Sequence, residues 1–144
     1  MTVQSHPVIT AITTANCLGV GLDATLGALR RGSSGLRPCD FPGAEFQTHI
    51  GRVDGLEDNP VTGSLARYDC RNSRLAEMTL LADDFAGQVV RCVERRGPRR
   101  VGLVLGTSTS GIQEGERAFA ERGDGTLPDW FDYRHSQDVH ATTE

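Results

Sequence analysis

The chain has 144 residues and a formal net charge of −4, and it holds no apolar run long enough to span a membrane. With 38% apolar and 6% aromatic residues it can form one modest hydrophobic core, so a single domain is expected. No basic block stands out, which argues against nucleic acid as a partner. The N-terminus lacks the charged and apolar regions of a secretory signal peptide, so the expected compartment is the cytoplasm.

No metal or redox site is predicted from the cysteine and histidine positions. His135 and His140 lie five residues apart, which does not place them on one helix face. The four cysteines form no C-x-x-C pair, so neither zinc nor a disulfide framework is expected: Cys17, Cys39, Cys70 and Cys92. We therefore expect four plain thiols, with no metal and no cofactor.

The first third of the chain predicts a strand, a helix and a second strand. Residues 8–15 read VITAITTA and are rich in β-branched side chains, which favours a strand. A helix is expected over residues 22–31, with leucines at helical spacing. Residues 33–44 read as a loop, and residues 46–53 alternate in the manner of a strand.

The rest of the chain predicts a long helix, a buried strand and a short helix. Apolar residues recur at 3.6-residue spacing over residues 72–96, so one heavily buried helix is expected, with Leu81 and Phe85 in its core face. Residues 100–105 form a continuous apolar run typical of a strand buried on both faces. A helix over residues 112–122 follows. Alternating strands and helices predict an α/β layer structure with a partly parallel sheet.

The glycine- and hydroxyl-rich loop after residues 100–105 is the most site-like feature. In open α/β sheets ligands bind at the carboxyl ends of strands, and backbone N–H groups there can hold a phosphate or an acyl carbonyl. An ordinary strand-to-helix turn explains the same pattern, with Ser110 as the helix N-cap and Gln113 completing a capping box. The candidate binding residues are Thr107, Ser108, Thr109, Ser110 and Gly111.

Four sequence blocks together resemble the N-terminal part of a β-ketoacyl-acyl-carrier-protein synthase of the thiolase-like superfamily. The opening block TAITTANCLG over residues 10–19 is similar to the family's T-G-x-G-x-x-S-P-L-G, although both glycines and the serine and proline are replaced. LRRGSSGL over residues 29–36 is similar to the family's L-x-x-G-x-S-G-I. The long helix over residues 72–96 and RVGLVLGTSTSG over residues 100–111 resemble its next helix and its R-x-G-x-x-x-G-(S/T)-x-x-x-G.

The resemblance implies a fold, an activity and a set of partners. The fold would be the N-terminal portion, residues 1–144, of a thiolase-like αβαβα layered domain. The activity would be acyl transfer: decarboxylative condensation of an acyl thioester with malonyl carried on acyl carrier protein, in fatty-acid, polyene or polyketide biosynthesis. The protein would form a homodimer or a ketosynthase heterodimer. The loop holding Thr109 would lie beside the acyl tunnel, with Thr109 at its gate.

The resemblance also implies that the catalytic cysteine and histidines lie beyond Glu144, so this chain alone is expected to be inactive. None of its four cysteines stands in the family's nucleophile context. Two other interpretations remain open. One is a non-catalytic, chain-length-factor-like partner subunit. The other is a small stand-alone binding module that uses the 107–111 loop for a phosphate.

Overall fold

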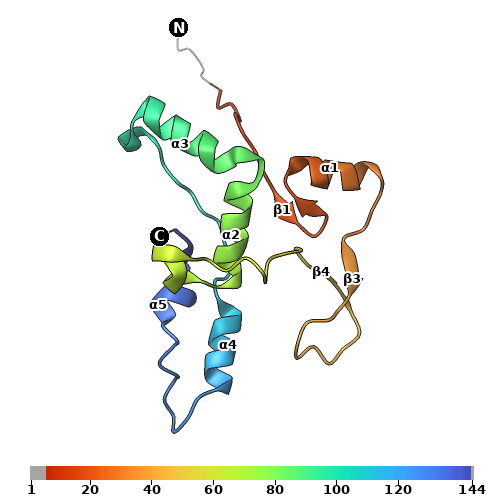
Figure 1. Cartoon of the computed structure of the whole chain (residues 1–144), viewed down its shortest axis with the longest axis vertical. Helices are drawn as coiled ribbons and strands as arrows, with labels where there is room; N and C mark the ends of the chain where they lie inside the picture. The colour runs from red at the N-terminus through yellow and green to blue at the C-terminus, as the bar shows by residue number, and fades with distance from the viewer. Residues whose placement is uncertain (1–5, 144) are drawn as a thin grey trace.

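The chain folds into a mixed α/β arrangement, which confirms the predicted class in its broad form. The structure is a computed structural model that describes residues 6–143. In Figure 1, α2 lies in the middle of the molecule, α3 lies at one end, and α4 and α5 lie at the other, while α1 and both β-hairpins lie on one side. Within the described residues the elements are β1 (Ala15–Asn16), β2 (Gly19–Val20), α1 (Leu22–Arg30), β3 (Leu36–Pro38), β4 (His49–Gly51), η1 (Gly63–Tyr68), α2 (Arg71–Leu81), η2 (Ala82–Asp84), α3 (Phe85–Arg96), η3 (Pro98–Arg100), α4 (Ile112–Ala120), α5 (Tyr133–Ser136) and η4 (Ala141–Thr143).

The predicted helix at residues 22–31 is confirmed as α1. It follows a tight β1–β2 hairpin, whose turn is fixed by Asn16. The Asn16 carboxamide oxygen accepts a hydrogen bond from the Leu18 amide at 2.8 Å, and its amide nitrogen donates to Thr25 Oγ1 at 3.1 Å. Asn favours such turns because its side chain bonds to backbone two residues on. The hairpin and the first turns of α1 therefore form one local unit.

A second hairpin, β3–β4, projects from the body as an arm (Figure 1). The strand predicted at residues 46–53 is confirmed in its central part as β4. The prediction that residues 33–44 form a loop is wrong in part, because residues 36–38 form β3 and pair with β4 in antiparallel register. The base of the arm packs closely on Cys17. A Cβ on Gly35 would lie 2.7 Å from Cys17 Sγ and one on Gly51 would lie 2.8 Å from it, so only glycine fits at both positions.

The single long helix predicted over residues 72–96 is broken into α2 and α3. Asp83 and Asp84 at the break both adopt left-handed backbone conformations, with φ of 54° and 53°. The Asp83 carboxylate Oδ2 accepts two hydrogen bonds there, from the Leu22 amide and from Thr13 Oγ1, each at 2.9 Å. Contacts with the N-terminal segment thus stabilise a kink that the uninterrupted apolar spacing does not predict.

The two strands predicted at residues 8–15 and 100–105 are absent from the observed sheets. Of the first segment only Ala15 lies in a strand, β1, and both sheets are two-stranded and antiparallel, so the expected parallel sheet is not observed among residues 6–143. Residues 98–100 form the 3₁₀ turn η3, and residues 101–107 run as irregular chain. A parallel strand needs neighbours on its edges, and within residues 6–143 no strand pairs with residues 8–13 or 101–106.

The buried core is small and lies where α2, α4, α5, η1 and η4 meet. The residues that are most buried carry mostly small side chains: Ala28, Leu56, Val61, Cys70, Ser73, Ser110, Ala118, Ser136 and Ala141. Leu81, predicted to be in the core, is 69% exposed, and Phe85 is half-buried. Within residues 6–143 no helix has both the length and the apolar composition needed to cross a bilayer.

Candidate functional site

The 107–111 loop connects the irregular segment 101–106 to α4 and is held by hydrogen bonds from both sides. The Thr107 hydroxyl donates to the Thr109 carbonyl at 2.6 Å, and Asn72 Nδ2 at the start of α2 donates to the same carbonyl. On the other side, Ser110 Oγ and the Gly111 amide both donate to the Ser136 carbonyl, at 3.2 Å and 2.8 Å. The loop is therefore fixed between α2 and α5.

The structure separates the five predicted site residues into two groups. Thr107, Ser108 and Thr109 are exposed, whereas Ser110 and Gly111 are buried against α5. The predicted capping box is wrong, because α4 begins after Gly111 with no side-chain cap and the Ser110 hydroxyl bonds to Ser136 instead. Only the first three residues thus present their side chains to a ligand, and the last two serve to hold the turn.

The N-terminus of α4 is already covered by a carboxylate. Glu114 Oε2 lies 2.9 Å from the position that a Cβ on Gly111 would take, and this oxygen is buried without a hydrogen-bond partner among the described residues. A negative side chain near a helix N-terminus is favourable to the helix dipole, but it repels a second anion. This arrangement disfavours the interpretation in which the loop binds a phosphate.

An ion pair next to the loop anchors the first turns of α2. The Asp69 carboxylate accepts hydrogen bonds from Arg74 at 2.7 Å and 2.6 Å and from the Val61 amide at 2.9 Å. The Arg74 hydrogen bonds hold the pKa of the Asp69 carboxyl below its usual value, against the opposing effect of partial burial. The Glu57 carboxylate forms further ion pairs with Arg71 and Arg74. This network ties the 54–63 loop to the helix that carries Asn72.

Sequence reasoning missed the residues that position the loop. Asn72 lies 37 residues from Thr109, and Ser136 lies 26 residues from Ser110. Neither belongs to a local motif, and Ser136 contributes a backbone carbonyl, which any residue type would supply. No pattern in the sequence marks such positions, because they are defined only by tertiary contacts.

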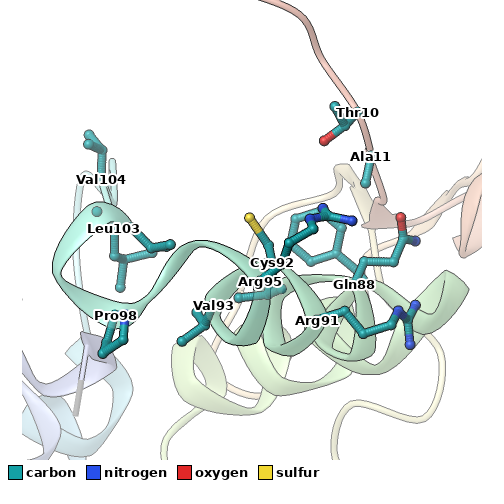
Figure 2. Close-up of a pocket in the computed structure, with 14 residues that line it drawn as sticks. Thr10, Ala11, Gln88, Arg91, Cys92, Val93, Arg95, Pro98, Leu103 and Val104 are labelled. Carbon is teal, nitrogen blue, oxygen red and sulfur yellow. The ribbon is translucent and has the colours of Figure 1, made fainter.

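A wide, largely apolar groove runs along α3, away from the 107–111 loop. Its volume is about 820 Å³. Figure 2 shows Thr10 and Ala11 of the N-terminal segment on one side, Leu103 and Val104 on the other, and α3 side chains including Cys92 and Arg95 between them. The groove is thus bordered by the two segments that were predicted to be strands.

The structure forms no disulfide among the four cysteines. All four are free thiols; Cys70 is buried at the N-cap of α2 with its sulfur 3.4 Å from Ser73 Oγ, and Cys92 is half-buried in the groove. His135 pairs with Asp132 at 3.2 Å and packs edge-on against Tyr68. Within residues 6–143 no group of three or more His, Cys, Asp or Glu side chains is arranged to hold a metal ion.

Comparison with known proteins identifies no relative of the chain. No protein-family model, no curated protein and no solved structure matches the chain. The resemblance to β-ketoacyl synthases therefore rests on the four sequence blocks alone.

Proposed function

We propose that this chain is the N-terminal part of a β-ketoacyl-acyl-carrier-protein synthase, or of its non-catalytic partner subunit. The observation that carries the proposal is the state of residues 8–13 and 101–106. Both segments overlap blocks at which the family has strands, yet both lie outside any sheet, and their aliphatic side chains are largely exposed, with Val104 96% and Ile9 80% exposed. Strand-forming sequence without a sheet around it is what an incomplete layered domain would show.

The position of the 107–111 loop supports the same proposal. It follows directly after the second of these segments, and its backbone is fixed by Asn72 and Ser136 while the Thr109 side chain is left exposed. A rigid loop with an exposed, β-branched side chain is suited to limit the width of a neighbouring acyl channel. Its role would be binding and selection of the acyl chain, and the chain itself would supply no catalytic residue.

The proposed reaction assigns the chemistry to residues that follow this chain. A cysteine thiolate takes the acyl group from its thioester, malonyl carried on the carrier protein loses CO₂, and the resulting enolate attacks the bound acyl carbonyl. The cysteine thiolate leaves, and the product is a β-ketoacyl thioester two carbons longer. Histidines beyond Glu144 would support the decarboxylation and stabilise the enolate.

The first test is a condensation assay on two forms of the protein. The full reading frame is expected to convert acyl- and malonyl-carrier protein to the β-ketoacyl product, whereas the 144-residue chain is expected to give no turnover. A full-length protein that carries another residue at the nucleophile position and is active only with a partner would identify the non-catalytic subunit. Turnover by the 144-residue chain would refute the assignment of the catalytic residues.

The second test addresses the loop itself. In the full-length enzyme, Thr109→Phe is expected to lower kcat/KM for long acyl donors more than for a two-carbon donor, because added atoms in a filled channel cost about 1–3 kcal/mol, or roughly 5- to 150-fold in rate. Ser108→Phe, one position along the same exposed loop, is the matched control. An equal loss for long and short donors would mean that the loop is a plain turn.

A further inference from the structure

The groove along α3 has the size and the lining of a site for a small molecule. Its volume of about 820 Å³ falls within the range of about 300–1,000 Å³ that is usual for ligand pockets. Such pockets are lined mainly by apolar side chains, and a few polar groups fix the orientation of the ligand. The apolar lining of this groove includes Phe85, Val89, Val93, Pro98, Leu103 and Val104.

The floor of the groove is one elongated face of α3. Phe85, Val89 and Val93 follow one another at intervals of four residues, so they lie in a row on the same side of the helix. At ~1.5 Å per residue this row extends about 12 Å along the helix axis. Leu103 and Val104 border the groove on one side and are 75% and 96% exposed (Figure 2). A long apolar floor of this kind suits an unbranched alkyl chain.

The charged side chains around the groove are all positive. The chain as a whole is acidic, with 19 Asp and Glu against 15 Lys and Arg, yet the described residues that line the groove include Arg91 and Arg95 and no acidic residue. Arg91 forms an ion pair with Asp84, whereas Arg95 forms none within residues 6–143. The Arg95 guanidinium is therefore free to hold an anionic head group beside the apolar floor (Figure 2).

Larger anionic partners match this groove less well. A bilayer surface cannot enter a groove, so it would leave the α3 floor uncovered. An acidic peptide could pair with Arg95, but its N–H and C=O groups would lie against apolar side chains and lose their hydrogen bonds to water. An alkyl chain carries no such groups, and a carboxylate accepts the bidentate, charge-assisted hydrogen bonds that a guanidinium donates. A fatty carboxylate therefore suits both the apolar floor and Arg95.

We propose that the groove along α3 binds a free, single-chain fatty carboxylate, with the alkyl chain on the α3 floor and the carboxylate at Arg95. The ligand is held without any bond being formed or broken. This binding does not depend on the proposed function, and its ligand is an anion rather than a thioester. It is a property of the 144-residue chain, in which residues 101–104 are exposed; a longer synthase that encloses these residues would close the groove.

The test begins with calorimetric titration of the 144-residue chain with three probes at pH ~8, where a carboxylate is ionised. Decanoate is expected to bind saturably at one site. Decanol, which has the same chain length and no charge, is expected to bind at least about tenfold more weakly, because it loses the charge-assisted hydrogen bonds to Arg95. Butyrate is expected to bind at least about 100-fold more weakly than decanoate, because each buried methylene strengthens binding about fourfold.

Two pairs of neighbouring substitutions locate the site. Arg95→Gln is expected to weaken decanoate binding at least about tenfold and to leave decanol binding unchanged. Its matched control is Arg96→Gln, the next residue of α3, which is exposed and does not line the groove. Val89→Asp places a carboxylate on the floor and is expected to abolish decanoate binding. Its control is Val90→Asp, at a position that is 55% exposed and outside the groove.

Several outcomes would overturn the proposal. These are the absence of saturable decanoate binding, equal affinities for decanoate and decanol, and equal effects of the two substitutions in either pair. Binding to phosphatidylglycerol vesicles or to an acidic peptide without binding of decanoate would assign the arginines to a larger partner and would also overturn it. The proposed function fails separately, because a longer protein without condensing activity would refute the synthase assignment and leave the decanoate titration unchanged.

Discussion

Two regions of the molecule differ in how well their side chains are buried and their backbone is hydrogen-bonded. One is the end that holds the 107–111 loop, and the other is the groove along α3 bordered by residues 10–11 and 101–104, here named the open face. Around the loop, side chains and carbonyls from α2, α4 and α5 meet, and Ser110, Ala118 and Ser136 are buried. At the open face the side chains are larger and more apolar, yet Leu103 is 75% exposed, and among the described residues no main-chain hydrogen bond engages residues 102–106.

This contrast shows that the apolar content of a segment does not by itself decide whether the segment becomes part of the core. The loop end is built from helices, whose backbone hydrogen bonds are internal, so small side chains suffice to pack it. Strand segments need edges supplied by other strands before their side chains can be buried. The expected consequence is that substitutions at the loop end change stability strongly and substitutions at the open face change it weakly.

The largest effect is expected from Gly111→Ala. A Cβ at this position would lie 2.3 Å from the Ser136 carbonyl oxygen and 2.9 Å from Glu114 Oε2, so α5 must move and the Gly111–Ser136 hydrogen bond is lost. We expect the free energy of unfolding to fall by about 3 kcal/mol, measured by urea denaturation.

Gly106→Ala is the matched control for this change. No atom lies within 4 Å of the position that its Cβ would take, and its φ is not in the left-handed region. Its effect should stay within about 0.5 kcal/mol, the usual range at exposed positions. Similar losses from both substitutions would show that the loop end is not packed as described.

The next effect concerns the Asp69–Arg74 ion pair, which supports the same end. Asp69→Asn is expected to cost about 1.5–3 kcal/mol at pH 7, because a partly buried hydrogen bond to a charged group is removed. The folded-state pKa of Asp69 lies below its unfolded value, so this contribution is present above pH ~4 and is lost as the pH falls through the folded-state pKa. The variant should therefore lose less stability than the wild type on acidification. Parallel acid titrations of the two proteins would contradict the assigned pKa shift.

Local sequence signals predicted those parts of the fold whose hydrogen bonds are local. The helix α1 formed where its leucine spacing and Gly32 placed it, and α4 formed within the predicted range 112–122, because helix hydrogen bonds lie within the segment. Residues 8–15 and 100–105 also carry clear strand composition, but pairing depends on neighbours that the described chain does not provide. The sequence thus predicted a preference for β conformation in these two segments, but it could not predict whether they would pair with other strands.

The candidate site and the helix break show the same limit. The loop at residues 107–111 was identified from its glycines and hydroxyls, whereas the Asn72 and Ser136 contacts that fix it arise from tertiary packing. The helix breaks between α2 and α3 although the apolar repeat continues across the break, because the Asp83 carboxylate accepts hydrogen bonds from Thr13 and from the Leu22 amide. Long-range contacts of single polar side chains leave no periodic signal in a sequence.

A smaller effect is expected at this break, which lies between the two regions. Asp83→Ala removes the acceptor for Thr13 and for the Leu22 amide, and we expect a loss of about 1 kcal/mol relative to Asp84→Ala. Both variants place alanine in a left-handed conformation, so the strain cancels in the comparison, and Asp84 contributes only an exposed ion pair to Arg91. Urea denaturation of the two proteins measures the difference. Equal stabilities would show that the N-terminal segment does not hold the kink.

The smallest effect in the 144-residue chain is expected from Leu103→Ala on the open face. Removing a buried leucine side chain typically costs 2–5 kcal/mol, but Leu103 is 75% exposed, so the loss here should be under about 0.5 kcal/mol. Leu81→Ala, at a position that is 69% exposed, should behave in the same way. In the longer synthase of the proposed function, Leu103→Ala should instead cost roughly 2–5 kcal/mol, because a complete layered domain would enclose this side chain. The ratio of the two losses, measured by urea denaturation under the same conditions, therefore reports how far the open face is covered. A loss above 2 kcal/mol in the short chain would show that residues 101–106 are already packed there, and the contrast between the two regions would not hold.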